Sequence, residues 1–129
     1  MNRYTKGARG ERELLNKFHE LGYSVVRSAG SGVNSISPDI IAIKNGKGYS
    51  FECKAWDKGR IGIEIEKFEM LKEWERNTAM QTFIAWRMSG KGWFFMKLDE
   101  LVKGDKDYSI TMRRALEINR VLDSIVRQD

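Results

Sequence analysis

The chain has 129 residues, of which 23 are lysine or arginine and 18 are aspartate or glutamate, so its net charge is +5. This length fits a single domain over residues 1–129 with a moderate core, and the excess of positive charge favours an anionic partner. The single cysteine excludes an internal disulfide and a cysteine-rich zinc site, and the sequence shows neither a long apolar run nor a signal-peptide pattern, which predicts a cytoplasmic protein without a membrane span.

The opening segment is basic and leads into an amphipathic helix. Its basic residues are Arg3, Lys6, Arg9 and Arg12. Apolar residues from Leu14 to Leu21 recur at helical spacing, and Gly22 is a stop signal. Glu11 is expected in the first turns, where the helix dipole alone would account for a carboxylate. The basic residues fit contacts to phosphate groups.

A short strand and a long loop follow the helix. Residues 23–27 are rich in β-branched and aromatic side chains, which predicts a strand. The next ten residues, 28–37, are rich in glycine and serine, and this loop is longer than the usual ~4 to 6 residues. An ordinary connection explains the composition, whereas the length favours a functional loop in which Ser31 contacts a phosphate.

Two predicted strands carry a pair of acidic residues and a lysine. Asp39 precedes the first strand (residues 40–44), and Glu52 and Lys54 lie in the second (residues 49–55), after an Asn-Gly-Lys-Gly turn. Because side chains alternate along a strand, Glu52 and Lys54 share one polar face, and only the opposite face is expected to join a core. A solvated pair on an exposed sheet face would also explain the two charged residues.

These residue types suit metal-assisted hydrolysis of a phosphodiester. Carboxylate oxygens from Asp39 and Glu52 are the ligands that Mg²⁺ prefers, and the ion would polarise the phosphoryl oxygens and generate hydroxide from water. Lys54 would hold or deprotonate the attacking water, or stabilise charge in the transition state. The pattern therefore predicts a metal-dependent nuclease site.

Four segments, K-G-A-x-x-E-R-E-L, V-V-R-S-A-G-S-G, P-D-I-I-A and E-C-K in this order, resemble the archaeal Holliday junction resolvase family (Hjc). The resemblance covers about residues 3–100 and implies a restriction-endonuclease-like nuclease fold of the α/β class, with a central mixed β-sheet flanked by α-helices. It implies metal ligation by Glu11, Asp39 and Glu52, catalysis by Lys54 with the loop serine Ser31, and DNA contacts by Arg12 and Arg27, to which the basic opening segment adds Lys6 and Arg9.

The rest of the chain completes the expected sheet and helices. The predicted elements are a helix over residues 64–77, strands over 82–87 and 93–97, a polar loop over 103–109 and a terminal helix from the N-cap Thr111 to about Arg127. The helix over 64–77 is acidic, which predicts a face that avoids DNA, and its Trp74 belongs either to the core or to a subunit interface. Residues 103–129 match no family motif.

The resemblance implies a structure-selective endonuclease that resolves four-way DNA junctions in recombination and repair. It would use Mg²⁺, with Mn²⁺ as the alternative, and act as a symmetric homodimer that makes paired nicks. A sliding clamp is a candidate protein partner, and the host is an archaeal cell or an archaeal virus. Two alternatives stay open, namely a related nuclease acting on flaps or duplex DNA and a junction-binding protein without catalysis.

Overall fold

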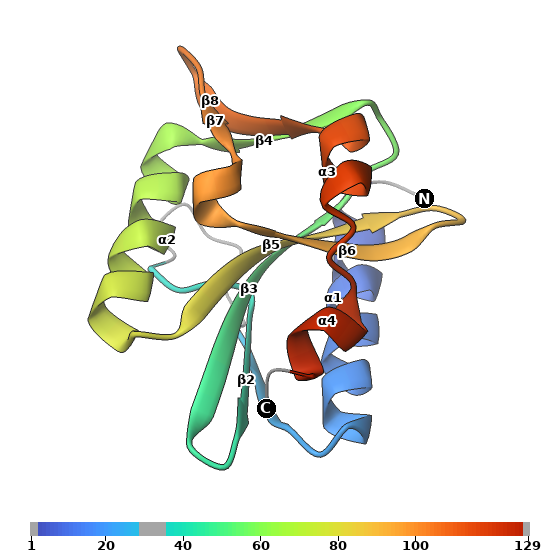
Figure 1. Cartoon of the computed structure of the whole chain (residues 1–129), viewed down its shortest axis with the longest axis vertical. Coiled ribbons are helices and arrows are strands. Elements are labelled where there is room, and N and C mark those ends of the chain that lie inside the picture. The colour runs from blue at the N-terminus through green and yellow to red at the C-terminus, as the bar shows by residue number, and fades with distance from the viewer. Residues whose placement is uncertain (1–2, 29–35, 128–129) are drawn as a thin grey trace.

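The computed structural model describes residues 3–28 and 36–127, which form a five-stranded sheet and a smaller three-stranded sheet with helices around them (Figure 1). The elements are α1 (Arg3–Glu20), β1 (Ser24–Arg27), β2 (Ile40–Lys44), β3 (Lys47–Ala55), β4 (Arg60–Glu64), α2 (Ile65–Thr78), β5 (Gln81–Met88), β6 (Gly92–Lys97), the 3₁₀-helix η1 (Leu98–Glu100), β7 (Val102–Lys103), β8 (Asp107–Thr111), α3 (Met112–Ile118) and α4 (Leu122–Val126). The larger sheet has the order β1-β2-β3-β5-β6, and only its β3–β5 pair is parallel. The predicted mixed sheet is confirmed.

The β2–β3 hairpin sets the register of the acidic residues. Its turn has two residues, Asn45 and Gly46, with φ of 52° and 80°, as expected for residues that tolerate the left-handed region. Ile40 pairs with Phe51 across the hairpin. Asp39, one residue before Ile40, therefore falls opposite Glu52.

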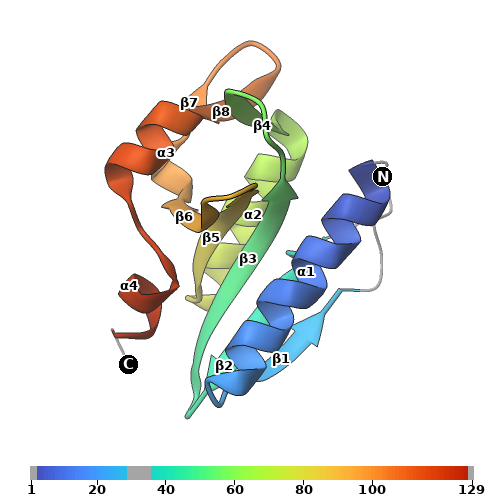
Figure 2. The same cartoon turned by 90° about the vertical axis from the view of Figure 1, so that its right-hand side faces the viewer.

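Both faces of the larger sheet are covered at its central strands β3 and β5, so the expectation of a core on only one face is wrong. On one face, α1 packs through Leu14 and Phe18 against Phe51 and its neighbours. On the other, α2 and the smaller sheet pack around Trp86. Figure 2 shows α1 and α2 on opposite sides of β3. The polar face of β3 is consequently buried, and Glu52 is only 7% exposed.

The smaller sheet has the strand order β4-β8-β7. The sequence pattern predicted no strand in any of these three segments. The predicted polar loop over residues 103–109 is partly wrong, because β8 begins at Asp107 and pairs with β4. Aromatic packing holds this sheet to α2, with Phe68 stacked on Tyr108 at a ring separation of 3.8 Å. No helix in the described ranges is long and apolar enough to cross a membrane.

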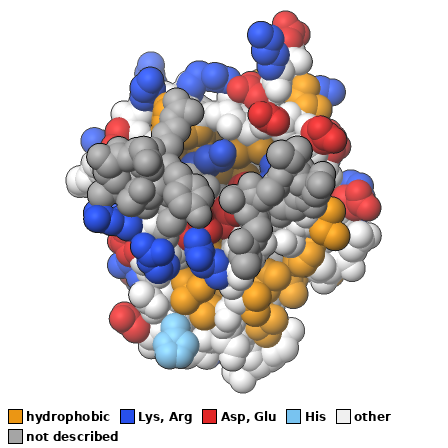
Figure 3. Space-filling model, turned by 180° about the vertical axis from the view of Figure 1, so that it is seen from behind, with side chains coloured by type: hydrophobic (Ala, Val, Ile, Leu, Met, Phe, Trp, Pro, Cys, Tyr) orange, Lys and Arg blue, Asp and Glu red, His pale blue; other side chains and the backbone are white. Residues whose placement is uncertain are grey.

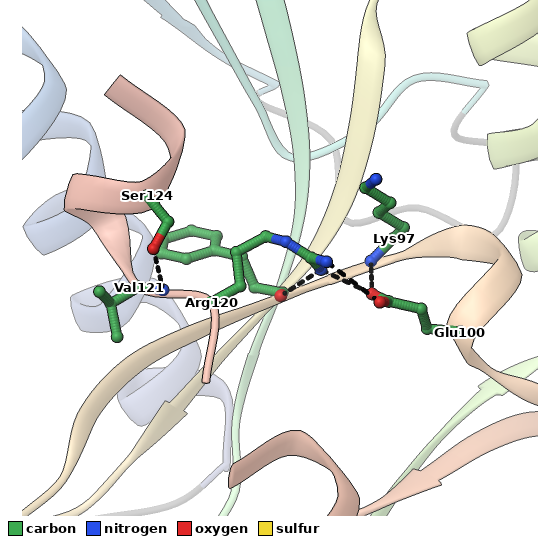
Figure 4. Close-up of polar contacts among 6 residues, drawn as sticks. Lys97, Glu100, Arg120, Val121 and Ser124 are labelled. Carbon is green, nitrogen blue, oxygen red and sulfur yellow. Dashed lines mark hydrogen bonds and ion pairs between the residues drawn. The ribbon is translucent and has the colours of Figure 1, made fainter. Parts of the chain in front are cut away.

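The predicted terminal helix is divided into two short helices. Thr111 is the N-cap, as expected, because its hydroxyl oxygen accepts a hydrogen bond from the Arg114 amide at 3.1 Å. The first helix ends where Asn119 adopts a left-handed conformation with φ of 50°. The carbonyl of Arg120 then accepts a hydrogen bond from the Phe95 amide on the outer strand β6 at 2.9 Å. The C-terminal segment thereby covers a sheet edge (Figure 4).

Candidate functional site

The hairpin and the start of β2 hold Asp39 in a defined orientation. Its Oδ2 accepts a hydrogen bond from the backbone N–H of Cys53 at 2.9 Å, and its own carbonyl accepts one from the Ser28 amide at 2.8 Å. The first bond fixes one carboxylate oxygen of Asp39 against the backbone between Glu52 and Lys54. The structure therefore brings together the aspartate and the E-x-K segment that the sequence singled out.

Glu52 lies in the centre of the sheet, where its charge is poorly solvated. Burial is the main cause that raises its pKa from 4.5 to about 8, and the nearby negative charge of Asp39 adds to the effect. Its buried Oε1 has no hydrogen-bond donor among the described residues. An unsatisfied, buried carboxylate oxygen is a strong acceptor for a cation.

Glu11 reaches the same region from α1. Gly10 brings the helix close to the end of β3, since a Cβ built there would lie 3.6 Å from the Cβ of Ala55. The pKa of Glu11 is raised by burial and by the charge of Asp39, and it is lowered by Arg27. Because α1 begins at Arg3, Glu11 lies in its third turn, beyond the reach of the helix dipole. The dipole therefore does not explain this carboxylate.

Lys54 is half-buried beside the acidic residues and borders a cavity. Its positive charge lowers the pKa of Glu52, which places the two groups within electrostatic range of each other. The cavity has a volume of about 430 Å³ and is lined by Cys53, Lys54, Ala55, Trp56, Arg60, Ile61, Gly62 and Asp107. Room for a substrate group is thus present directly next to the lysine.

The predicted DNA-binding arginines are exposed. Arg9 and Arg12 lie on α1, and Arg27 ends β1. Lys6 belongs to α1, but its side chain lies outside the described part of the chain, as does the whole of Ser31. Figure 3, a view from behind Figure 1, shows Lys and Arg side chains close to acidic ones near the centre of that face.

Other lysines that are near the site in sequence are not brought to it. Lys44 and Lys47 flank the β2–β3 turn, at the opposite end of the hairpin from Asp39. Lys47 instead lies over the ring of Tyr49. Arg60, by contrast, lines the cavity next to Lys54 and donates two hydrogen bonds to Asp107 across the smaller sheet. Proximity in sequence to Asp39 and Glu52 therefore does not place Lys44 and Lys47 at the acidic site.

The carboxylates of Glu11, Asp39 and Glu52 are ligands that suit a hard divalent cation, although they do not yet surround one point in space. The described His, Cys, Asp and Glu side chains include no group of three already arranged to hold an ion. Yet the charge of Asp39 raises the pKa of both Glu11 and Glu52, and the charge of Glu11 also raises that of Glu52. Glu52 Oε1 lacks a hydrogen-bond donor among the described residues. An ion would satisfy that oxygen and relieve the repulsion among the carboxylates.

The sequence interpretation missed Lys67, which reaches the site from α2. Its Nζ lies 3.7 Å from Glu52 Oε1, so one residue of the helix predicted to avoid DNA lies at the acidic site. The available signal was its helical spacing, because Lys67, Leu71 and Trp74 fall on one face. Leu71 is buried and the indole N–H of Trp74 donates to Ser50 Oγ at 2.8 Å, so this face packs on the sheet.

Comparisons with known proteins agree with this architecture. The sequence matches the family model of the archaeal Holliday junction resolvase (Hjc) over residues 2–129, including the C-terminal segment that no motif placed. Three relatives are named crossover junction endodeoxyribonuclease Hjc. The one from Sulfolobus acidocaldarius is 28% identical over 98% of this chain and 90% of its own length. The relatives from Archaeoglobus fulgidus and Methanocaldococcus jannaschii are 31% and 33% identical, over 82% and 87% of this chain and 79% and 80% of their own.

Two solved structures share the fold. Archaeoglobus fulgidus Hjc, described as a Holliday junction resolvase from an archaeal hyperthermophile, superposes with a TM-score of 0.78 at 24% identity, covering 86% of this chain and 93% of that one. The bacterial homing endonuclease I-Ssp6803I superposes with a TM-score of 0.56 at 12% identity, covering 86% and 75%. The sheet arrangement is thus shared with two nucleases. On the family match and the sequence relatives, the chain belongs to the archaeal Holliday junction resolvase (Hjc) family of endonucleases.

Proposed function

We propose that this protein cuts four-way DNA junctions in the cytoplasm by metal-dependent hydrolysis of phosphodiester bonds. The observation that carries the proposal is the buried Glu52 carboxylate beside Asp39, with Lys54 at the edge of a cavity, in a chain of the resolvase family. A purely structural ion pair would not leave a buried carboxylate oxygen without a hydrogen-bond donor. This arrangement favours catalysis over simple junction binding.

Glu11, Asp39 and Glu52 would hold the divalent ion, with Mg²⁺ as the first choice and Mn²⁺ as the alternative. When bound, the ion would polarise the scissile phosphate and lower the pKa of a water molecule. The Cys53 amide keeps Oδ2 of Asp39 in place and so orients the carboxylate before any ion arrives. The sheet and α2 exclude bulk water from Glu52, which strengthens electrostatic interactions there.

Lys54 is the residue that we assign to the reacting phosphate. It shares the β3 face of Glu52 and borders the cavity, so its ammonium is available to a group that enters from solvent. There it would orient the attacking water or stabilise the negative charge that develops on the phosphoryl oxygens. Ser31, which lies outside the described residues, is proposed to assist at the same phosphate.

Contacts to the DNA backbone would come from the exposed arginines Arg9, Arg12 and Arg27, together with Lys6. Guanidinium groups bind phosphate through charge and paired hydrogen bonds without reading the bases. Selection of a junction over a duplex would then follow from the geometry of its phosphates and from bending at the crossover.

A symmetric homodimer would supply two sites for the two strands that must be cut. Its support is an apolar area on the outer strands of the larger sheet, where Val26 on the edge strand β1 is 56% exposed and Ile43 on β2 is also exposed. A second copy of the chain would bury this area. Trp74 is half-buried and already bonded to Ser50, so its share in such an interface would be limited to its outer edge.

Cleavage of an end-labelled four-way junction tests the proposal directly. Linear duplex and flap DNA serve as controls, each with Mg²⁺ and with EDTA. Paired, symmetric, Mg²⁺-dependent cuts confined to the junction are expected. Tight binding without cuts would support a binding protein, and equal cutting of flap or duplex would point to a nuclease of broader substrate choice.

A further inference from the structure

Lys67 joins two parts of the acidic site that are far apart in sequence. Its ammonium lies 3.7 Å from Oε1 of Glu52 on β3 and donates a hydrogen bond to the backbone carbonyl of Ser37 at 3.4 Å. Ser37 is two residues before Asp39 in the sequence. One side chain from α2 therefore contacts two of the three segments that supply candidate metal ligands.

The helix fixes the position of this ammonium. Trp74, two helical turns further along the same face, donates its indole N–H to Ser50, and Leu71 between them is fully buried. These contacts align α2 with β3, so that Trp74 lies over Ser50 as Lys67 lies over Glu52. The Lys67 side chain is only 27% exposed, which further limits its freedom.

Within the part of the chain that the structure describes, no other cation forms an ion pair with the Glu52 carboxylate that the Lys67 ammonium faces. Among the described residues, the ion pair that Glu52 forms is the one with Lys67, and Oε1 receives no hydrogen bond. Two unit charges in a poorly solvated environment attract strongly. In the metal-free protein, Lys67 is therefore the cation that faces Glu52 when that side chain is ionised, which is the form that a divalent ion would bind.

We propose that Lys67 is a positioning residue. Its ammonium takes the place of the divalent ion beside Glu52 when no ion is bound, and the ion displaces it on binding. The proposal rests on the proposed metal-dependent function. An ammonium and a metal ion that both approached Oε1 would repel each other. The lysine and the ion therefore compete for Glu52. The lysine keeps the acidic site folded when empty and lowers its affinity for the ion.

The test compares K67M, which keeps the length of the side chain without its charge, with K67R, which keeps the charge. K72M is the matched control, since Lys72 lies on the same helix and pairs with Glu69 at the surface. Unfolding temperatures are measured in EDTA and at rising Mg²⁺, without DNA, at constant ionic strength and about pH 9 to limit proton competition. The dissociation constant for Mg²⁺ follows from the rise in unfolding temperature.

We expect K67M to unfold at a lower temperature in EDTA and to bind Mg²⁺ more tightly, by about fivefold or more, the usual scale of coupling between two ligands. K67R and K72M should resemble the wild type in Mg²⁺ affinity. A merely structural lysine would lower the unfolding temperature of K67M equally with and without Mg²⁺, and that result would overturn the proposal. Unchanged or weaker Mg²⁺ binding by K67M would overturn it too.

The E52Q variant separates this inference from the proposed function. If Mg²⁺ stabilises the wild type but not E52Q, the metal site stands and the K67M result decides the role of Lys67. If Mg²⁺ stabilises neither protein, or both equally, Glu52 is not a ligand. The metal site and the inference about Lys67 would then fail together.

Discussion

Nε of Arg27 lies 3.3 Å from Oε1 of Glu11 and donates a hydrogen bond to it, although the two residues are 16 positions apart in the chain. A side chain predicted to contact DNA is thus paired with one predicted to bind metal. The pair joins α1 to the end of β1, directly before residues 28–37, for which the sequence predicts a loop. Metal binding by Glu11 and phosphate binding by Arg27 should therefore influence each other.

The R27A variant should bind a four-way junction more weakly and with a shallower dependence on salt. Loss of one phosphate contact lowers the slope of log K against log salt by about one. Binding is measured in EDTA, at several salt concentrations. R113A is the matched control, because Arg113 is 91% exposed on α3 and pairs only at the surface with Glu117. An unchanged slope in R27A would place Arg27 away from the DNA phosphates.

Removal of a ligand charge at the acidic site should abolish cleavage and leave binding intact. Asp39→Asn and Glu52→Gln keep the shape of each side chain, and the amide oxygen introduced by Asp39→Asn can still accept a hydrogen bond from the Cys53 amide. We expect cleavage of the junction to fall by at least about a hundredfold, since several kcal/mol of metal stabilisation is lost. Junction affinity measured in EDTA should change little.

Glu73→Gln is the control for this pair of variants, because Glu73 is an exposed acid on α2. It should cleave like the wild type. Loss of binding together with cleavage in the Asp39 or Glu52 variant would indicate a folding defect rather than a lost ligand. Retention of cleavage by either one would remove that residue from the metal site.

Local patterns in the sequence predicted the part of the site that depends on neighbouring strands. The hairpin follows from Asn45 and Gly46, which accept positive φ, and its register then places Asp39 opposite Glu52. The helix predicted over residues 64–77 is observed at Ile65–Thr78, and the strands after it were likewise predicted, because their apolar pattern is strong.

Contacts between distant segments could not be predicted in this way. Lys67 reads as a surface charge in an acidic helix until α2 is docked on β3, and only then does it meet Glu52. The burial of Glu52 depends on the same docking. The division of the terminal helix occurs at Asn119, whose left-handed conformation lies within an otherwise continuous helical pattern. In each case tertiary packing decided an outcome that local preference left open.

The raised pKa of Glu52 predicts that the metal-free protein loses stability as pH rises. The pKa is about 8 in the folded protein and 4.5 ordinarily, so between these values the folded state keeps a proton that the unfolded chain releases. The free energy of unfolding therefore falls through this range, by up to about 1.4 kcal/mol per pH unit, and levels off above pH 8.

Denaturant unfolding of the wild type and E52Q in EDTA, across this pH range, measures the effect. E52Q lacks the titrating group. Its free energy of unfolding should therefore exceed that of the wild type by a growing amount, reaching a few kcal/mol by about pH 8. Saturating Mg²⁺ should restore most of the stability of the wild type at high pH, because the ion replaces the lost proton. Parallel curves for the two proteins in EDTA would show that Glu52 is ionised throughout.

The Arg120–Glu100 ion pair fastens the C-terminal segment to the sheet (Figure 4). Arg120 donates from Nη1 to Oε1 at 2.6 Å and from Nη2 to Oε2 at 3.1 Å, and Nη1 also donates to the carbonyl of Phe95 at 3.1 Å. Burial tends to raise the pKa of Glu100, but the hydrogen bonds from Arg120 and the Lys97 amide outweigh it and leave that pKa below its usual value.

The R120M variant should therefore lose about 2 to 4 kcal/mol of stability at neutral pH, because it leaves a partly buried carboxylate without its cation. The loss should shrink as pH falls below the usual pKa of glutamate and through the lowered pKa of Glu100, since the protonated Glu100 no longer needs the arginine. R114M is the control, as Arg114 forms an exposed pair with Glu117 and should cost less than about 1 kcal/mol. Denaturant unfolding at neutral and acid pH decides the outcome. Equal destabilisation by R120M and R114M would mean that the backbone bond between Phe95 and Arg120, rather than the ion pair, holds the segment in place.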